Sequence, residues 1–245
     1  MENVRFVALN PISKKRLDQH RKHSHGLGLL EIGAKPVTTK LAIVAGGPSI
    51  NDNVEKIKNF EGEVWAINEA FQWCLERNIS ATFYGFDPRR RIVKTCYGAK
   101  KAILADTVHP SVFKALSEAD IELARTGKGE IEGWSTAAST APEIAIKRGH
   151  TGITFFGCES SFETKSHAFG NNKQDRVWVE CGGKEYMTTP QLVTQVELLS
   201  LLARSAPDFI KIESGGLLAA MIKNTDCRLT HVSKRIDERL KKDAA

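Results

Sequence analysis

The sequence predicts an α/β protein with a doubly wound, mostly parallel sheet, helices on both faces and a small β insertion. Apolar segments of strand length alternate with segments of helical periodicity along most of the chain, which is the pattern of βαβ units. Residues 41–45 are continuously apolar, as expected of a strand that is buried on both faces of a parallel sheet. A glycine turn at Gly46-Gly47 follows this segment directly, which is where such sheets hold ligands.

The first half of the chain repeats the strand–helix unit. After a short strand at 5–9, strands are expected at residues 41–45, 64–67, 81–86, 102–105 and 121–124. Helices are expected at 54–60, 69–77 and 110–119, the last with Pro110 at its first position.

The second half contains longer connections. A glycine-rich loop at 126–133 precedes a helix of small residues at 135–148, which Gly149 ends. Either Pro142 kinks this helix, or the helix starts near 139–140 with Pro142 in its first turn. Residues 152–157 form the strongest later strand, and the polar segment 158–175 is too long for a plain connection. The small β insertion lies at 175–187. Beyond it we expect helices at 189–203, 217–222 and 233–242 and a strand at 209–212.

Positive charge is concentrated near the N-terminus. Residues 1–40 hold eight Lys/Arg and three acids, a net +5 of the chain's +6. We therefore divide the chain into a basic, partly ordered arm at 1–40 and a single domain at 41–245. The basic run 14–22 is either a solvated segment or a contact for an anionic ligand. Nucleic acid is an unfavoured partner, because such binders gather basic residues on a folded face.

The cysteine pattern and the hydropathy of the chain predict where in the cell the protein lies. Five cysteines, an odd number, are scattered without a C-x-x-C pair, which argues against a disulfide framework and against a cysteine-based zinc site. No stretch approaches the roughly 18 apolar residues of a membrane span, and the N-terminus has no apolar signal core. We expect reduced thiols, no membrane span and a cytoplasmic location.

The turn Gly46-Gly47-Pro48-Ser49 is the leading candidate for nucleotide binding. Glycines leave backbone N–H groups open to phosphate, and Ser49 can cap the following helix and donate a hydroxyl hydrogen bond. The turn matches neither the P-loop nor the full G-x-G-x-x-G spacing. The alternative is a tight strand-to-helix turn without a ligand.

Polar residues follow three other predicted strands. Asn68, Asp87 and Glu159 each come at or just after a strand's carboxyl end, so the fold would bring them to the edge that carries Gly46. Asn68 is suited to a ribose or base, and Asp87 and Glu159 to Mg²⁺ that carries phosphates. The alternatives are an Asn helix cap and an Asp-Pro turn.

Two further candidates lie near the glycine-rich and polar loops. His167 could act as an acid or a base, or could carry phosphate, although a lone loop histidine is more often a surface residue. Ser135, at the start of the small-residue helix, is a candidate nucleotide-binding residue. We therefore expect Asp87, Glu159 and His167 to form the catalytic set.

Taken in order, these motifs resemble the 6-hydroxymethylpterin diphosphokinase MptE-like family, some members of which occur in phages. The resemblance covers about residues 41–205, and Gly47-Pro48-Ser49 is its most specific part. The other matching segments are the Gly-Phe-Asp-Pro strand end at 85–88, the helix and strand at 135–149 and 153–157, and the His-containing loop at 166–170. The sequence departs from the family pattern at Glu159, where members commonly carry Asp, and at Ala45, where they often carry Gly.

The resemblance implies a Rossmann-like fold and a nucleotide-dependent transferase. Its namesake activity transfers diphosphate from ATP, with Mg²⁺, to a hydroxyl group of a small acceptor. The Gly-Pro-Ser turn and a sheet-edge Asn are also similar to bacterial sialyltransferases that use CMP-sialic acid. The first alternative is therefore a glycosyltransferase with a nucleotide-sugar donor and a glycan acceptor. The second is a non-catalytic binding protein associated with a phage or host. The sequence does not decide whether the protein forms a homo-oligomer.

Overall fold

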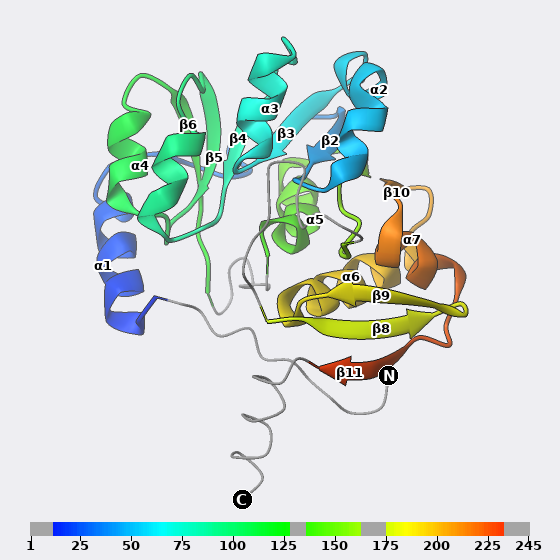
Figure 1. The fold of residues 1–245 in the computed structure, drawn as a ribbon. Helices are drawn as coiled ribbons and strands as arrows, with labels where there is room; N and C mark the ends of the chain where they lie inside the picture. The colour runs from blue at the N-terminus through cyan, green and yellow to red at the C-terminus, as the bar shows by residue number, and fades with distance from the viewer. Residues whose placement is uncertain (1–11, 128–135, 163–174, 233–245) are drawn as a thin grey trace, which may run out of the picture.

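The computed structural model describes residues 12–127, 136–162 and 175–232. Within these residues the main sheet has eight strands, and every neighbouring pair is parallel. From one edge to the other (Figure 1) the strands are β1 (Leu30–Glu31), β6 (Asp120–Ala124), β5 (Lys101–Ala105), β4 (Thr82–Gly85), β3 (Glu63–Ile67), β2 (Lys40–Val44), β7 (Gly152–Phe156) and β10 (Ile210–Glu213).

Helices cover both faces of this sheet. Ala42 and Val44 of β2 belong to one buried cluster and Leu41 and Ile43 to the other, because successive strand residues point to opposite faces. The first cluster lies under η1 (Pro48–Asn53), α2 (Val54–Lys58), α3 (Ala70–Glu76), η2 (Arg90–Thr95) and α4 (Pro110–Ala115). The second lies under α5 (Ala137–Arg148), α6 (Pro190–Ser205) and α7 (Gly216–Lys223). The predicted doubly wound α/β class is confirmed.

A second, antiparallel sheet stands beside α6 and α7 (Figure 1). It consists of β8 (Val177–Cys181), β9 (Lys184–Thr188) and β11 (Arg228–Val232), in the order β11-β8-β9. The β8–β9 hairpin turns at Gly182-Gly183, both with positive φ, which a two-residue hairpin turn requires. The hairpin is the predicted β insertion, whereas its third strand comes from a later segment that was not predicted to be β.

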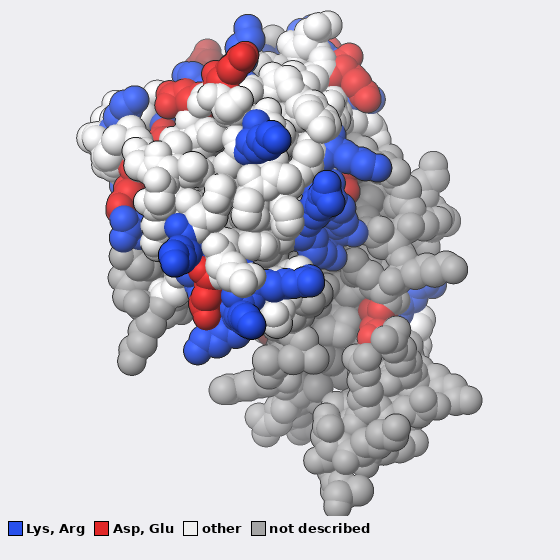
Figure 2. Space-filling model, turned by 90° about the vertical axis from the view of Figure 1, so that its left-hand side faces the viewer, with Lys and Arg blue, Asp and Glu red and all other residues white. Residues whose placement is uncertain are grey.

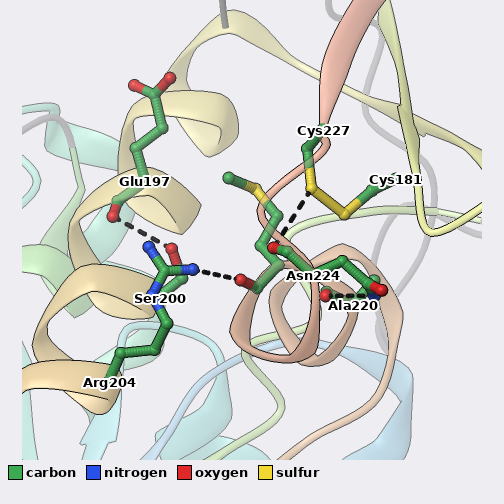
Figure 3. Close-up of a disulfide and its surroundings, with 8 residues drawn as sticks. Cys181, Glu197, Ser200, Arg204, Ala220, Asn224 and Cys227 are labelled. Atoms are coloured by element: carbon green, nitrogen blue, oxygen red, sulfur yellow. Dashed lines mark hydrogen bonds between the residues drawn. A yellow bond between two sulfur atoms is a disulfide. The ribbon is translucent and has the colours of Figure 1, made fainter.

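A disulfide joins Cys181 at the end of β8 to Cys227, which precedes β11 (Figure 3). The prediction that all five cysteines are reduced thiols is therefore wrong for this pair. The two residues are 46 positions apart and become neighbours only because β11 pairs with β8, with Arg228 opposite Glu180. The other three cysteines, Cys74, Cys96 and Cys158, are free and buried.

The described part of the N-terminal arm packs on the edge of the main sheet. Helix α1 (Lys14–His25) lies against α4, and β1 pairs with β6 (Figure 1). His20 Nδ1 lies 2.9 Å from the Thr107 carbonyl, and the Ser24 hydroxyl donates to the Asp106 carbonyl at 2.9 Å. Neither α1 nor β1 was predicted. The predicted strand at 5–9 and helix at 233–242 lie outside the described residues.

No helix in the described ranges has the length and apolar character needed to cross a membrane.

A charged cluster lies where β3 begins and α5 ends. The Arg148 guanidinium contacts Glu63 Oε2 at 2.7 Å and Glu122 Oε1 at 3.0 Å. His150 lies beside it, with its ring edge against Trp65 and its Nδ1 donating to the Thr39 carbonyl at 3.1 Å. These contacts join α5 to the sheet, so we interpret the cluster as stabilising the fold.

Stability should fall in mild acid because of His150. Burial lowers the pKa of His150 below its ordinary value of 6.5, although the Thr39 carbonyl and Glu63 oppose the shift. The unfolded chain therefore binds this proton more readily than the folded chain. The resulting stabilisation is present above pH 6.5 and is lost as pH falls through the lowered pKa, at up to about 1.4 kcal/mol per pH unit.

Urea unfolding of His150→Gln between pH 8 and pH 5 checks this expectation. The variant should show a flatter decline in unfolding free energy than the parent. His231→Gln, at an exposed histidine, is the matched control and should not flatten the decline. Equal slopes for the parent and His150→Gln would show that His150 does not carry the effect.

Candidate functional site

The sheet has a topological switch point between β2 and β7. The chain runs from β2 through β3, β4 and β5 to β6, which lies next to the edge strand β1, and α5 then returns it to β7 on the other side of β2. The connections after β2 and β7 therefore leave the sheet in opposite directions. In open α/β sheets, ligands bind outside the carboxyl ends of the strands at such a point.

The turns after β2 and β7 interlock at the switch point. Gly47 N–H donates to the Gly157 carbonyl at 2.8 Å, and Ser49 N–H donates to Glu159 Oε1 at 2.7 Å. A Cβ on Gly47 would lie 1.5 Å from Glu159 Oε2 and 2.5 Å from the Gly157 carbonyl oxygen. Gly157 has φ +70°, and a Cβ added to it would lie 2.6 Å from the Ala45 carbonyl oxygen. Both glycines are thus required for the loops to meet.

The turn's backbone donors are used within the protein. The sequence predicted that phosphate would take the free N–H groups of the turn, but those of Gly47 and Ser49 already have protein acceptors. The carboxylate of Glu159 occupies the position beside the turn that a phosphate would need, and two anions repel at this separation. Gly46, Pro48 and Ser49 remain candidates for contact with another part of a ligand.

Three buried polar atoms at this edge have no hydrogen-bond partner among the described residues: Ser49 Oγ, Asn68 Oδ1 and Glu159 Oε2. They follow β2, β3 and β7 respectively, which are adjacent strands in the sheet. Asn68 adopts φ +48°, a left-handed conformation that strains most side chains. Because buried polar atoms nearly always find partners, these three indicate a place for a hydrogen-bonding ligand or ordered water.

Hydrogen bonds from neighbouring helices anchor the loop that carries Glu159. Leu218 N–H at the start of α7 donates to the Glu159 carbonyl at 3.0 Å. Gln195 of α6 donates to the Ser160 hydroxyl at 2.9 Å and accepts from Thr136, which caps α5, at 2.5 Å. The backbone of the loop that carries Glu159 is therefore anchored to α7, and its next residue, Ser160, to α6 and the cap of α5.

Cys158 has no chemical role that its surroundings support. Burial raises the pKa of its thiol well above the usual range, and the neighbouring Glu159 carboxylate raises it further. A buried thiol in this state is a core side chain and a poor nucleophile.

Asp87 is paired with arginine. Its carboxylate accepts from Arg89 Nε at 2.7 Å and from the Arg89 backbone N–H at 2.9 Å, and Arg91 lies 3.5 Å away. Arg89 contacts both carboxylate oxygens, in the bidentate geometry typical of strong pairs. Asp87 therefore positions arginines that are 41% and 54% exposed.

The carboxyl ends of β4 and β5 form a basic surface that the sequence interpretation missed. Burial lowers the pKa of His109, and nearby His20, Arg90 and Arg16 lower it further. Arg90 continues the run Arg89-Arg90-Arg91 and is exposed. The signal in the sequence was the run of three arginines just after a predicted strand end. The pairing of Arg89 and Arg91 with Asp87 could not be predicted from the sequence.

Mg²⁺ does not fit the described carboxylates. The Asp87 oxygens are taken by guanidinium groups, and Glu159 Oε1 is taken by the Ser49 N–H. Over residues 12–127, 136–162 and 175–232, no three His, Cys, Asp or Glu side chains form a group that could hold a metal ion. The predicted Asp87–Glu159 metal site thus has no free ligand set there. His167 and Ser135 lie outside the described residues.

Comparisons with known proteins concern the fold alone. No family model matches the chain, and no curated protein sequence matches it, so the MptE-like resemblance stays a prediction. Among solved structures, the chain is similar to the MAf glycosyltransferase from Magnetospirillum magneticum AMB-1, with a TM-score of 0.56 and 16% sequence identity. The match covers 83% of this chain and 37% of that protein. The chain is therefore similar in fold to part of a glycosyltransferase of greater length.

Proposed function

We propose that this protein is a nucleotide-dependent transferase whose donor is a nucleotide sugar bound at the β2–β7 switch point. The observation that carries the proposal is the set of buried polar atoms on Ser49, Asn68 and Glu159 that have no partner in the described part of the chain. They lie at the ends of three adjacent strands, which span about 10 Å at a strand spacing of about 4.8 Å. A polyhydroxylated ligand of nucleotide-sugar size suits this row.

Two groups of residues at this sheet edge suit different parts of such a donor: Asn68 and Glu159 in one group, and the arginines near Asp87 in the other. Asn68 Oδ1 and Glu159 Oε2 are acceptors, so they would bind hydroxyl groups of a ribose or sugar. The negative charge of Glu159 disfavours phosphate beside it. The arginines that Asp87 positions, together with Arg90, would instead hold the donor phosphate, for which guanidinium groups are well suited.

The transfer itself would depend on positioning and charge. The acceptor's hydroxyl oxygen attacks the anomeric carbon of the sugar, the bond between that carbon and the phosphate oxygen breaks, and the nucleotide leaves with the electron pair. The acceptor's proton passes to Glu159 Oε2, the carboxylate oxygen for which the described residues provide no partner. The arginine guanidinium groups would neutralise charge that develops on the leaving phosphate.

A diphosphokinase is the less favoured reaction for this site. It would use Mg²⁺ to bridge the phosphates of a nucleoside triphosphate, and the described carboxylates do not fit that ion. The glycosyltransferase-like fold adds support for a nucleotide-sugar donor, although at 16% identity the likeness concerns the fold.

Nucleotide binding can be tested on the purified chain by thermal shift. CMP, UDP, GDP and ATP would each be added with Mg²⁺ or with EDTA, because bound ligand stabilises the fold by mass action. We expect stabilisation by a nucleoside mono- or diphosphate that EDTA does not remove. Stabilisation only by a triphosphate with Mg²⁺ would favour the diphosphokinase, and no shift with any nucleotide would favour a non-catalytic binding protein.

Asn68→Gly is the sharpest variant for this site. Glycine keeps the left-handed backbone of Asn68 and removes only the side chain, so nucleotide affinity should fall about fivefold to tenfold while the fold is kept. Asn78→Gly is the matched control, because Asn78 also has positive φ (56°) and is exposed at the end of α3. Unchanged affinity in Asn68→Gly would remove Asn68 from the site.

A further inference from the structure

An apolar groove lies on the side of the molecule, away from the switch point. It runs between the end of α1, helix α4 and strand β6, and has a volume of about 610 Å³. Strand β6 is four positions from β2 in the sheet, or about 19 Å at the usual spacing. The groove is therefore separate from the proposed donor site.

Aliphatic and aromatic side chains form the floor of the groove. They come from the segment before β1, from α4 and its C-cap, and from β6, and include Leu29, Phe113, Leu116 and Ile121. Leu27 borders it with 44% of its surface exposed, and neighbouring Leu30 is 36% exposed. An apolar lining with few polar groups and a volume of roughly 300–1,000 Å³ is typical of small-molecule sites.

The polar lining of the groove is basic or neutral. It consists of His23, Lys114, Ser111 and Ser117, and none of the described residues that line the groove is acidic. Lys114 is exposed and has no ion-pair partner among the described residues. Figure 2 shows this side of the molecule, where both Lys/Arg and Asp/Glu side chains surround a broad area of uncharged residues.

We propose that the groove binds a single-chain amphiphile with an anionic head, a carboxylate or a phosphate. The alkyl chain would lie on Phe113, Leu116 and Ile121, and the head would meet Lys114 and the basic end of α1 at His23. A second copy of the chain fits less well, because two half-exposed leucines are few for an interface of about 20 residues a side.

Dodecyl phosphate, titrated calorimetrically below its micelle concentration into the full chain, tests this. Ser117→Trp, which fills the groove from an exposed position, should abolish binding. Lys114→Ala should weaken it about threefold to fivefold, and Lys114→Arg should restore it. Lys58→Ala and Leu201→Gln, exposed on α2 and α6, are matched controls that should change nothing.

Two further ligands separate the contributions of head and chain. Inorganic phosphate should bind at least roughly 100-fold more weakly, because it lacks the alkyl chain, and dodecanol should bind about threefold to fivefold more weakly than dodecyl phosphate. Equal affinity for dodecanol, or full affinity in Ser117→Trp, would overturn the proposal. So would binding to anionic vesicles without binding to the monomeric amphiphile, or a concentration-dependent dimer that Ser117→Trp abolishes.

Discussion

Gly47→Ala is expected to lower the unfolding free energy by about 3 kcal/mol and to disrupt the switch-point site. The new Cβ would lie 1.5 Å from Glu159 Oε2 and 2.5 Å from the Gly157 carbonyl oxygen. The first contact could be relieved by moving a side chain, but the second is with backbone. Overpacking of this kind typically costs about 1–3 kcal/mol, and separating the two loops would also remove the Ser49–Glu159 hydrogen bond.

The cause of this effect is steric, since Gly47 has φ −74° and alanine adopts that conformation without strain. Gly26→Ala is the matched control, because Gly26 also has negative φ (−73°) with a helical ψ (−9°), and an added Cβ would come no closer than 3.4 Å to the neighbouring atoms. Urea unfolding and nucleotide thermal shift would be measured on both variants. A Gly47→Ala protein with parental stability and nucleotide response would show that the two loops need not meet.

Most of the main sheet was predictable because its strands are buried on both faces. Strand β2 and its neighbours therefore appear in the sequence as continuous apolar runs that end in turn residues. The edge strand β1 has only two residues and gives no such signal. Helix α1 is polar on most of its surface, and its docking depends on His20 and Ser24, which are buried polar residues.

The sequence allowed us to predict that the candidate residues lie at one sheet edge, but not which contacts they make there. Residues at strand ends were placed correctly at one sheet edge, because parallel strands have their carboxyl ends in common. Sequence could not show that Glu159 reaches the Ser49 N–H, since the positive φ of Gly157 brings its loop to that turn. Nor could it show that Asp87 pairs with Arg89, which changes the carboxylate from a metal ligand candidate to an arginine-positioning group.

Arg148→Ala is the second large effect, with an expected loss of about 3 kcal/mol in unfolding free energy. The Arg148 side chain is 9% exposed and bridges Glu63 and Glu122, which are 30% and 12% exposed. Removing one partner of a buried ion pair leaves a carboxylate without compensation and typically costs about 3–5 kcal/mol. We expect a loss at the lower end of this energy range, because Glu63 retains contact with solvent. Arg228→Ala, at an exposed pair with Glu180, should change stability by less than about 1 kcal/mol.

Two further measurements test whether the uncompensated Glu122 carboxylate causes the loss of stability in Arg148→Ala: the pH dependence of the loss, and the effect of a second substitution at Glu122. Burial raises the pKa of Glu122 and Arg148 opposes that shift, so the variant should raise it further. A raised carboxyl pKa gives stability that is present below the unfolded value and lost as pH rises through the folded value. The deficit of Arg148→Ala should therefore shrink from pH 8 to pH 5. Glu122→Gln should destabilise the parent but stabilise Arg148→Ala, and the same sign in both backgrounds would show that the uncompensated carboxylate is not responsible.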